Sequence, residues 1–202
     1  MIQHQSDATP SMVSMSTSHA PAGRSTPGGE HVTSSATRSL TREHAAGYVW
    51  AAARLSLGWI FLWPFFDKMF GLGHDVPSAK AWINGGNPTK GFLSGSIGPF
   101  SSFYHDIAGA GWVNWLFMFG LIVIAVGLLF GVFMRLACAG GALLVVLMWS
   151  ASLPPANDIF LDDHIIFALL LVGLALVGAG NTLGVGHWWT RTSLVQRFAW
   201  LA

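Results

Sequence analysis

Residues 113–133 read VNWLFMFGLIVIAVGLLFGVF, an apolar run without a single Asp, Glu, Lys or Arg. About 20 apolar residues in a helix cross the roughly 30 Å hydrocarbon layer of a bilayer. Helices are expected because lipid offers no partner for backbone N–H and C=O groups, so each segment must pair them internally. The stretch therefore predicts a transmembrane helix and an all-α membrane protein.

Three further apolar stretches predict helices, and the four together predict a four-helix transmembrane bundle with spans at 45–69, 113–133, 136–153 and 164–179. The composition agrees, because hydrophobic residues make up 52% of the 202 residues and charged residues only 9%. A soluble domain carries about a quarter charged residues. The net charge of +1 and the lack of a Lys/Arg run argue against a nucleic-acid partner. The single cysteine, Cys138, excludes an intrachain disulfide.

Arginine placement predicts the orientation of the bundle. Cytoplasmic loops of membrane proteins are enriched in Lys and Arg. With four spans, five arginines fall on one side: Arg38, Arg42, Arg135, Arg191 and Arg197. We therefore expect both termini in the cytoplasm, with the chain in the plasma membrane. The polar residues 1–44 predict a disordered cytoplasmic tail, residues 45–189 the membrane domain, and residues 190–202 a short second tail.

The loop of residues 71–112, between the first two predicted spans, is too long and too apolar for a simple connection. Ser78 to Ile83 predicts a short helix that Gly85 and Gly86 end. Phe100, Phe103 and Ile107 have helical spacing and predict an interfacial helix. We expect this partly structured loop to cover the external end of the bundle.

Two cations lie within or at the end of the first span, where charge is costly. Arg54 and Lys68 share one helical face with Gly58, Phe61 and Phe65. Two interpretations of Arg54 stay open: it faces the bundle, binding an anionic or quinone-like ligand or a polar group of another helix, or it extends to the cytoplasmic surface. Lys68 either ends the span beside Asp67 or lies in a pocket under the long loop.

Two other groups could carry chemistry. Asp162, Asp163 and His164 precede or open the fourth span, where an acid caps the helix; a histidine beside acids could also relay protons. The Gly-rich stretch Asn84 to Gly91 contains Lys90, and such loops can hold an oxyanion, although a P-loop spacing is absent. We take Lys68, Asp163 and His164 as candidate catalytic residues and Arg54 and Lys90 as candidate ligand-binding residues. We predict neither a metal site nor haem, because no HxxxH or HExxH pair is present and no span has a histidine at mid-membrane depth.

The stretches from Arg54 to Gly58 and from Phe66 to Gly71 (FDKMFG) resemble the opening of DoxX/DoxD-type membrane proteins, in which an Arg-containing helix ends in a Lys followed by Gly. The Asp162-Asp163-His164 entry to the fourth span and the loop from Gly86 to Leu93 resemble members of the same family. The resemblance extends from about Trp50 to Trp189 and implies a four-helix bundle.

The resemblance also implies a range of functions. DoxD proteins are the membrane subunits of thiosulfate:quinone oxidoreductase, which works with a second component, DoxA. Other relatives are membrane partners of sulfurtransferase and superoxide-handling enzymes. We expect a DoxX-like redox subunit that passes electrons from thiosulfate or a related sulfur anion to quinone, in contact with lipid and a DoxA-like or soluble oxidoreductase subunit, with an oligomer allowed. The alternative is a non-catalytic scaffold that recruits soluble oxidoreductases. A small-solute transporter ranks last, because no pair of broken helices is evident.

Overall fold

The computed structural model describes residues 29–155 and 161–198, and the chain divides into two compact units, Met1–Ser39 and Leu40–Ala202. In the first unit the described residues 29–39 are helical. The second unit contains the apolar helices and the long loop.

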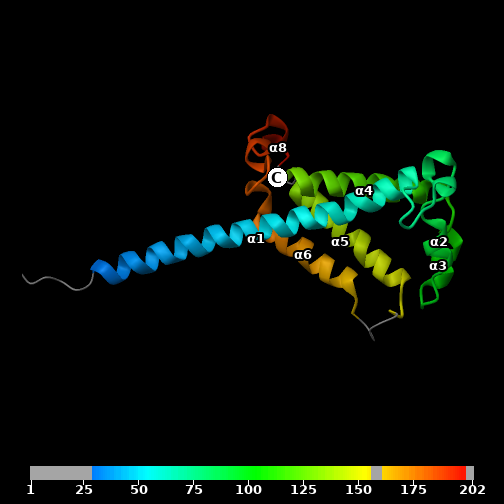
Figure 1. Ribbon diagram of the computed structural model, residues 1–202, viewed down its shortest axis with the longest axis horizontal. Helices are drawn as coiled ribbons and strands as arrows, with labels where there is room; N and C mark the ends of the chain where they lie inside the picture. Colours follow the sequence, from blue (N-terminus) through cyan, green and yellow to red (C-terminus); the bar gives the residue numbers. More distant parts are fainter. Residues whose placement is uncertain (1–28, 156–160, 199–202) are drawn as a thin grey trace, which may run out of the picture. The chain divides into compact units, whose positions relative to one another are not determined.

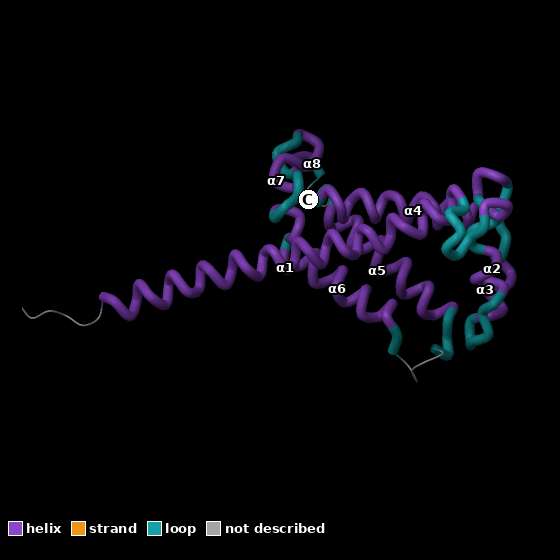
Figure 2. The backbone as a smooth tube through the Cα atoms, viewed as in Figure 1, coloured by secondary structure: helices purple, strands orange, loops and turns teal. Residues whose placement is uncertain are grey.

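Four long helices carry the apolar stretches (Figure 1): α1 (Gly29–Phe70), α4 (Gly111–Phe130), α5 (Met134–Ala151) and α6 (Asp163–Val177). Short helical segments lie in the connections (Figure 2): η1 (Ser78–Lys80), η2 (Trp82–Asn84), α2 (Lys90–Ser94), α3 (Ser101–Ile107), η3 (Ala179–Asn181), α7 (Gly186–Trp189) and α8 (Ser193–Arg197). In the described ranges, strand pairing is limited to one bridge between Leu72 and Pro77. The regular secondary structure of the described residues is therefore helical.

Three helical segments are long and apolar enough to cross a membrane: Arg42–Phe70, Gly111–Phe130 and Met134–Ala151. The fourth apolar helix, α6, has 15 residues. It is about 22 Å long at 1.5 Å per residue, shorter than the roughly 30 Å hydrocarbon layer. These three segments support the prediction of a multi-pass membrane protein.

The helix ends follow local punctuation. Gly131, with φ of 74°, ends α4, and Gly178, with φ of 62°, ends α6. Both helices therefore end two or three residues before the predicted limits of 133 and 179, because these backbone conformations favour glycine and do not continue a helix. At its other end α6 begins as predicted, since the Asp162 carboxylate accepts the backbone N–H of His164.

The start of α1 differs from the prediction. The helix begins at Gly29, so residues 29–44 are helical where the sequence predicted a disordered tail; residues 1–28 lie outside the described part. The prediction of disorder depended on the lack of large apolar residues that could form a core. Residues 30–46 nevertheless contain neither Gly nor Pro, and an existing helix grows without a new nucleation cost.

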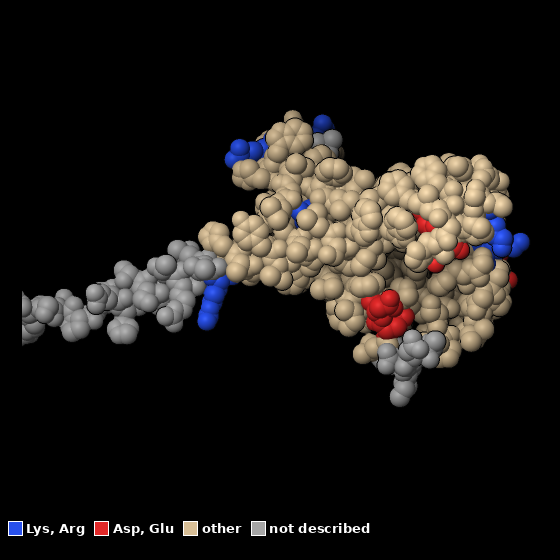
Figure 3. All heavy atoms as spheres, viewed as in Figure 1, with Lys and Arg blue, Asp and Glu red and all other residues tan. Residues whose placement is uncertain are grey.

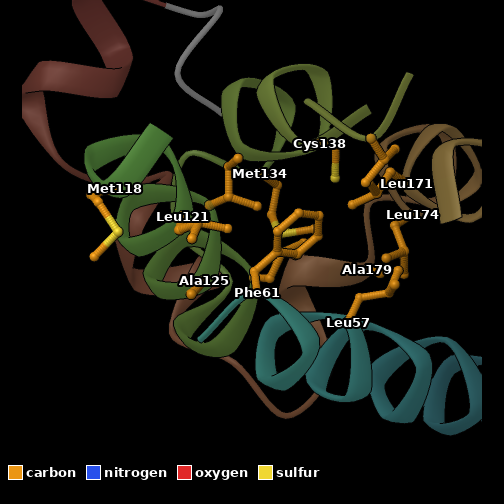
Figure 4. Close-up of a cluster of buried hydrophobic side chains, with 13 residues drawn as sticks. Leu57, Phe61, Met118, Leu121, Ala125, Met134, Cys138, Leu171, Leu174 and Ala179 are labelled. Atoms are coloured by element: carbon orange, nitrogen blue, oxygen red, sulfur yellow. The ribbon is translucent and has the colours of Figure 1, made fainter. Parts of the chain in front are cut away.

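One core joins the four long helices. Figure 4 shows its buried side chains converging from all four helices and from η3: Leu57, Phe61, Met118, Leu121, Ala125, Met134, Cys138, Leu171, Leu174 and Ala179. Cys138 is buried there, as a small packing residue should be. Close packing needs small residues: a Cβ on Gly127 would lie 2.6 Å from the Cβ of Ala137. In Figure 1, α5 and α6 lie side by side and run in opposite directions.

The long loop is folded, as predicted, but differently in detail. Ser78 to Ile83 forms two short 3-10 turns rather than one helix, because the extended Ala81 (ψ of 144°) separates η1 from η2. The predicted interfacial helix is present as α3. A second, smaller core holds α2 and α3 against the end of α5: Leu93, Tyr104 and Ala151 are buried together. We call residues 71–110 the cap.

Charged side chains gather toward the ends of the apolar helices. Figure 3 shows blue Lys or Arg atoms beside α8 and beside the cap, and the surface between them is mostly tan, with one small blue spot and with red atoms toward the cap. Arg191 and Arg197 belong to the α8 end, and Lys68, Lys80 and Lys90 to the cap end. This separation is the pattern of a membrane protein whose apolar middle faces lipid.

Candidate functional site

Arg54 is fully buried, with 0% of the residue exposed. Its Nη1 donates to the carbonyl oxygens of Leu128 and Leu129 in the last turn of α4. Its Nη2 donates to the carbonyl oxygens of Thr182 (3.3 Å) and Leu183 (3.0 Å), which follow η3. Arg54 therefore faces the bundle interior and does not extend to the surface.

Glycines surround this guanidinium and leave no room for side chains. A Cβ on Gly131 would lie 2.9 Å from Arg54 Nη1, and one on Gly184 would lie 3.2 Å from Nη2. Gly131 and Gly180 also approach each other, since a Cβ on Gly180 would lie 2.8 Å from the Gly131 carbonyl oxygen. We call Arg54 and the four glycines, Gly131, Gly180, Gly184 and Gly186, the arginine junction. It joins α1, the end of α4 and the segment after α6.

The chemistry of the arginine junction is that of a helix cap. The last carbonyls of a helix lack intrahelical partners and carry partial negative charge. Arg54 supplies both hydrogen bonds and positive charge to that end of α4. Four of its contacts are thus made to the protein's own backbone, and only Nε has no partner among the described residues.

A groove of about 1360 Å³ is lined by α4, α5 and the cap. Its floor consists of apolar residues from the outward faces of α4 and α5, including Leu116, Phe119, Leu143 and Leu147, all exposed. Along α5 the floor extends from Leu136 to Ala151. Its polar end is formed by the cap. The groove is therefore amphiphilic: apolar along the helices and polar at one end.

Two predicted site residues line this groove, Lys68 at the end of α1 and Lys90 at the start of α2. Lys80 and Asp75 line it as well. Neither Lys68 nor Lys90 is paired with a carboxylate in the described part of the chain. The aliphatic part of the Lys90 side chain lies near Gly109, since a Cβ added to Gly109 would be 3.5 Å from the Lys90 Cδ. Both ammonium groups are available as donors to a ligand.

The cap is fixed to the helices by buried polar contacts. The side-chain Oδ1 of Asn114, in α4, accepts the backbone N–H of Thr89 at 3.2 Å and its hydroxyl at 2.7 Å. The Tyr104 hydroxyl contacts the Leu147 carbonyl oxygen and the Ser150 hydroxyl on α5. The Ser96 hydroxyl donates to the Ala151 carbonyl oxygen. The polar end of the groove is therefore held rigidly over α4 and α5.

The Gly-rich stretch does not present a row of free amides. The backbone N–H of Lys90 donates to the Asn87 side chain, and that of Thr89 donates to Asn114. The N–H of Gly86 donates to the Ala81 carbonyl oxygen. The Lys90 ammonium, rather than the backbone around it, is what this stretch offers to an anion.

Asp67 holds the turn that leads from α1 into the cap. Its carboxylate is buried and accepts the backbone N–H groups of His74, Asp75 and Val76 at 3.0 to 3.2 Å. Asp67 therefore fixes the backbone beside the groove, whereas its neighbour Lys68 points to a different side and lines the groove.

The remaining predicted residues, Asp163 and His164, lie at the start of α6 with Asp162. The His164 Nδ1 is 2.8 Å from Asp162 Oδ2 and 3.3 Å from Asp163 Oδ1. One ligand atom of each residue lies within 4.8 Å of the others, so the three could hold a metal ion together. None of them lines the groove. The structure thus brings Lys68 and Lys90 into one place and leaves Arg54, Asp163 and His164 in two others.

Sequence reasoning missed Asn114, Thr89 and Tyr104, which lock the cap. Asn114 had a detectable signal, because it is a polar side chain near the start of an apolar span. Tyr104 and Thr89 carried none, since their partners are distant in the sequence.

No family model matches the chain, and no curated protein or solved structure matches it either.

Proposed function

We propose that the chain is a DoxX-like membrane subunit of a redox system, in which a sulfur anion is oxidised and a membrane quinone is reduced. The observation that carries the proposal is the amphiphilic groove with Lys68 and Lys90 at its polar end. The resemblance of the Arg54 and FDKMFG stretches to DoxX/DoxD proteins gives the reaction class. The two lysines at its polar end support the groove as the location of the site.

The groove residues fit a quinone. An isoprenoid tail needs an apolar surface that is continuous with the bilayer, and the exposed faces of α4 and α5 offer one. Quinone oxygens accept hydrogen bonds, and Lys68 and Lys90 can donate them. When bound, a quinone would supply a two-electron, two-proton acceptor. The same lysines would attract thiosulfate, a dianion, from the side of the cap.

The topology that goes with this function is a four-span bundle with both termini in the cytoplasm. The C-terminal end of α6 reaches the α4–α5 turn, because Gly180 packs on Gly131. The helix also runs antiparallel to α5, and this packing supports a fourth span although the helix has only 15 residues. Arg42, Arg135, Arg191 and Arg197 then share the side that Lys- and Arg-rich cytoplasmic loops occupy.

The test is thiosulfate-dependent quinone reduction by the purified protein in lipid, alone and with any co-purifying partner. We expect Lys68→Ala and Lys90→Ala to lower the rate strongly without lowering the amount of folded protein. Arg42→Gln removes an exposed charge from the other end and serves as the control. Arg54 is a poor test residue, because its loss would disturb the arginine junction. Full activity in both lysine variants would refute this location of the site.

A second function is favoured by a separate observation. The cap exposes large apolar side chains, with Ile97, Phe100 and Phe103 each more than half exposed. Such a surface suits a partner protein, which is the property of a scaffold that recruits soluble oxidoreductases. Affinity purification in mild detergent should then recover an oxidoreductase, and Phe100→Ser, outside the groove lining, should release it. Recovery of the chain alone would count against the scaffold.

A further inference from the structure

The segment that follows η3 lies at the end of the helices away from the cap. Its first residues are held by Arg54, which donates hydrogen bonds to the Thr182 and Leu183 carbonyl oxygens. The backbone N–H of Val185 donates to the Phe130 carbonyl oxygen at 2.9 Å. Residues 183–198, which we call the C-terminal segment, therefore start at the level where α4 ends.

The first helix of this segment is packed on the bundle by one side only. Gly186 is buried, and the Trp189 ring meets the edge of the Phe133 ring at 5.9 Å between centroids. Trp188, the neighbour of Trp189, is 69% exposed. Because adjacent helical residues point about 100° apart, α7 holds one indole against the bundle and presents the other outward.

The exposed side chains of the C-terminal segment combine apolar and cationic groups. Leu183, Val185, Trp188 and Phe198 are exposed apolar residues. Arg191 and Arg197 are exposed cations, and the Arg197 guanidinium lies 5.9 Å from the centroid of the Phe198 ring. This mixture of indole, aliphatic and guanidinium groups is typical of surfaces that sit at the membrane–water interface.

The charge at this end is predominantly positive. Among the described side chains of α1 before residue 50, of the α4–α5 turn and of the C-terminal segment, the arginines are Arg42, Arg135, Arg191 and Arg197. Among these described side chains one is a carboxylate, that of Glu43. A cationic surface at headgroup depth is complementary to anionic phospholipids, at about 1 kcal/mol for each Lys or Arg near the membrane.

We propose that the C-terminal segment is a binding surface for anionic phospholipid headgroups, with Arg191 and Arg197 contacting phosphate and Trp188 inserted among the upper acyl carbons. The occupant is a lipid rather than a soluble protein, because the first residues of the segment are held where the apolar helices end, which is the depth of the lipid headgroups. The surface is separate from the groove, so it does not depend on the redox function.

The experiment uses a fluorescent probe on the full chain. Ser193 is exposed in α8, so Ser193→Cys can be labelled with an environment-sensitive dye, while buried Cys138 leaves the parent chain as the labelling control. The labelled protein is placed in nanodiscs of phosphatidylcholine, alone or mixed with phosphatidylglycerol. We expect emission at shorter wavelength with phosphatidylglycerol, and a weaker shift at high salt.

The double variant Arg191→Gln/Arg197→Gln should weaken apparent phosphatidylglycerol binding by about tenfold or more. Lys80→Gln, which removes a charge from the cap, should leave the shift intact. Equal emission in the two lipid mixtures, or a shift that persists in the double variant, would overturn the proposal. So would the same shift on adding inorganic phosphate to phosphatidylcholine nanodiscs, since that would assign the surface to a free anion.

Discussion

Arg54 places a full positive charge among apolar helices, where an unpaired arginine costs about 3 kcal/mol or more. Its neighbours explain how the fold accommodates it. Four backbone carbonyl oxygens accept its N–H groups, two of them in the last turn of α4. These carbonyls would otherwise lack donors in an apolar region, so the cation and the helix end satisfy each other.

The first prediction concerns this residue. Arg54→Met keeps much of the side-chain volume but removes every donor, so it should destabilise the protein by about 3 kcal/mol or more. Arg54→Lys should fall between, because an ammonium cannot reproduce the forked geometry. The thermal unfolding midpoint in mild detergent measures the effect, with Arg42→Gln as an exposed control. A midpoint for Arg54→Met that matches the control would mean that these hydrogen bonds contribute nothing to stability.

The sequence could predict that Arg54 lies on a helical face with Lys68, but not what Arg54 binds. Leu128 and Thr182 are more than 70 residues away, and their carbonyls have no side-chain signature. Lys68 was the reverse case. A pocket under the long loop was one of the two interpretations left open for Lys68, and Lys68 does line the groove.

At the scale of elements, the cap depends on a few buried polar contacts. Asn114 offers one oxygen to both the N–H and the hydroxyl of Thr89. These contacts hold α2, and with it Lys90, beside the groove. The apolar spans α4 and α5 were predicted within three residues from hydrophobicity. The cap was not, because its conformation depends on contacts between distant segments.

The second prediction tests how the cap is docked. Asn114→Leu preserves side-chain size but leaves two donors of Thr89 unsatisfied, which should raise the population of an undocked cap about tenfold or more. Limited trypsin digestion after Lys90 should accelerate to the same extent. Ser102→Ala, at an exposed position of α3, is the control. An unchanged cleavage rate would show that the apolar contacts of Leu93 and Tyr104 hold the cap without Asn114.

At the scale of the whole molecule, the question is how many times the chain crosses the bilayer. Three helical segments have the length and hydropathy of spans, while α6 is short and relies on its packing against α5 and on the arginine junction. If α6 also crosses, the cap and the start of α6 share one side, and the C-terminal segment lies on the other.

The third prediction follows from four spans. Single cysteines introduced at exposed Ala79, in the cap, and Leu161, before α6, should react with an impermeant maleimide from outside intact cells. A cysteine at exposed Ser193 should react only after the membrane is opened. Buried Cys138 provides the background. Labelling of positions 161 and 193 from the same side would contradict the crossing of α6.

The central claim is that the groove on α4 and α5 binds a quinone, and photolabelling tests it most directly. A photoreactive quinone analogue is added to the protein in nanodiscs, and the labelled peptides are identified. We predict labels on α4 and α5. Gly120→Trp should suppress them, because Gly120 lines the groove and nothing lies within 4 Å of its would-be Cβ, so the indole enters the groove without a clash. Ala139→Trp, exposed on α5 outside the groove lining, should leave the labels intact. Labels elsewhere, or labels on α4 and α5 that Gly120→Trp does not reduce, would contradict the claim.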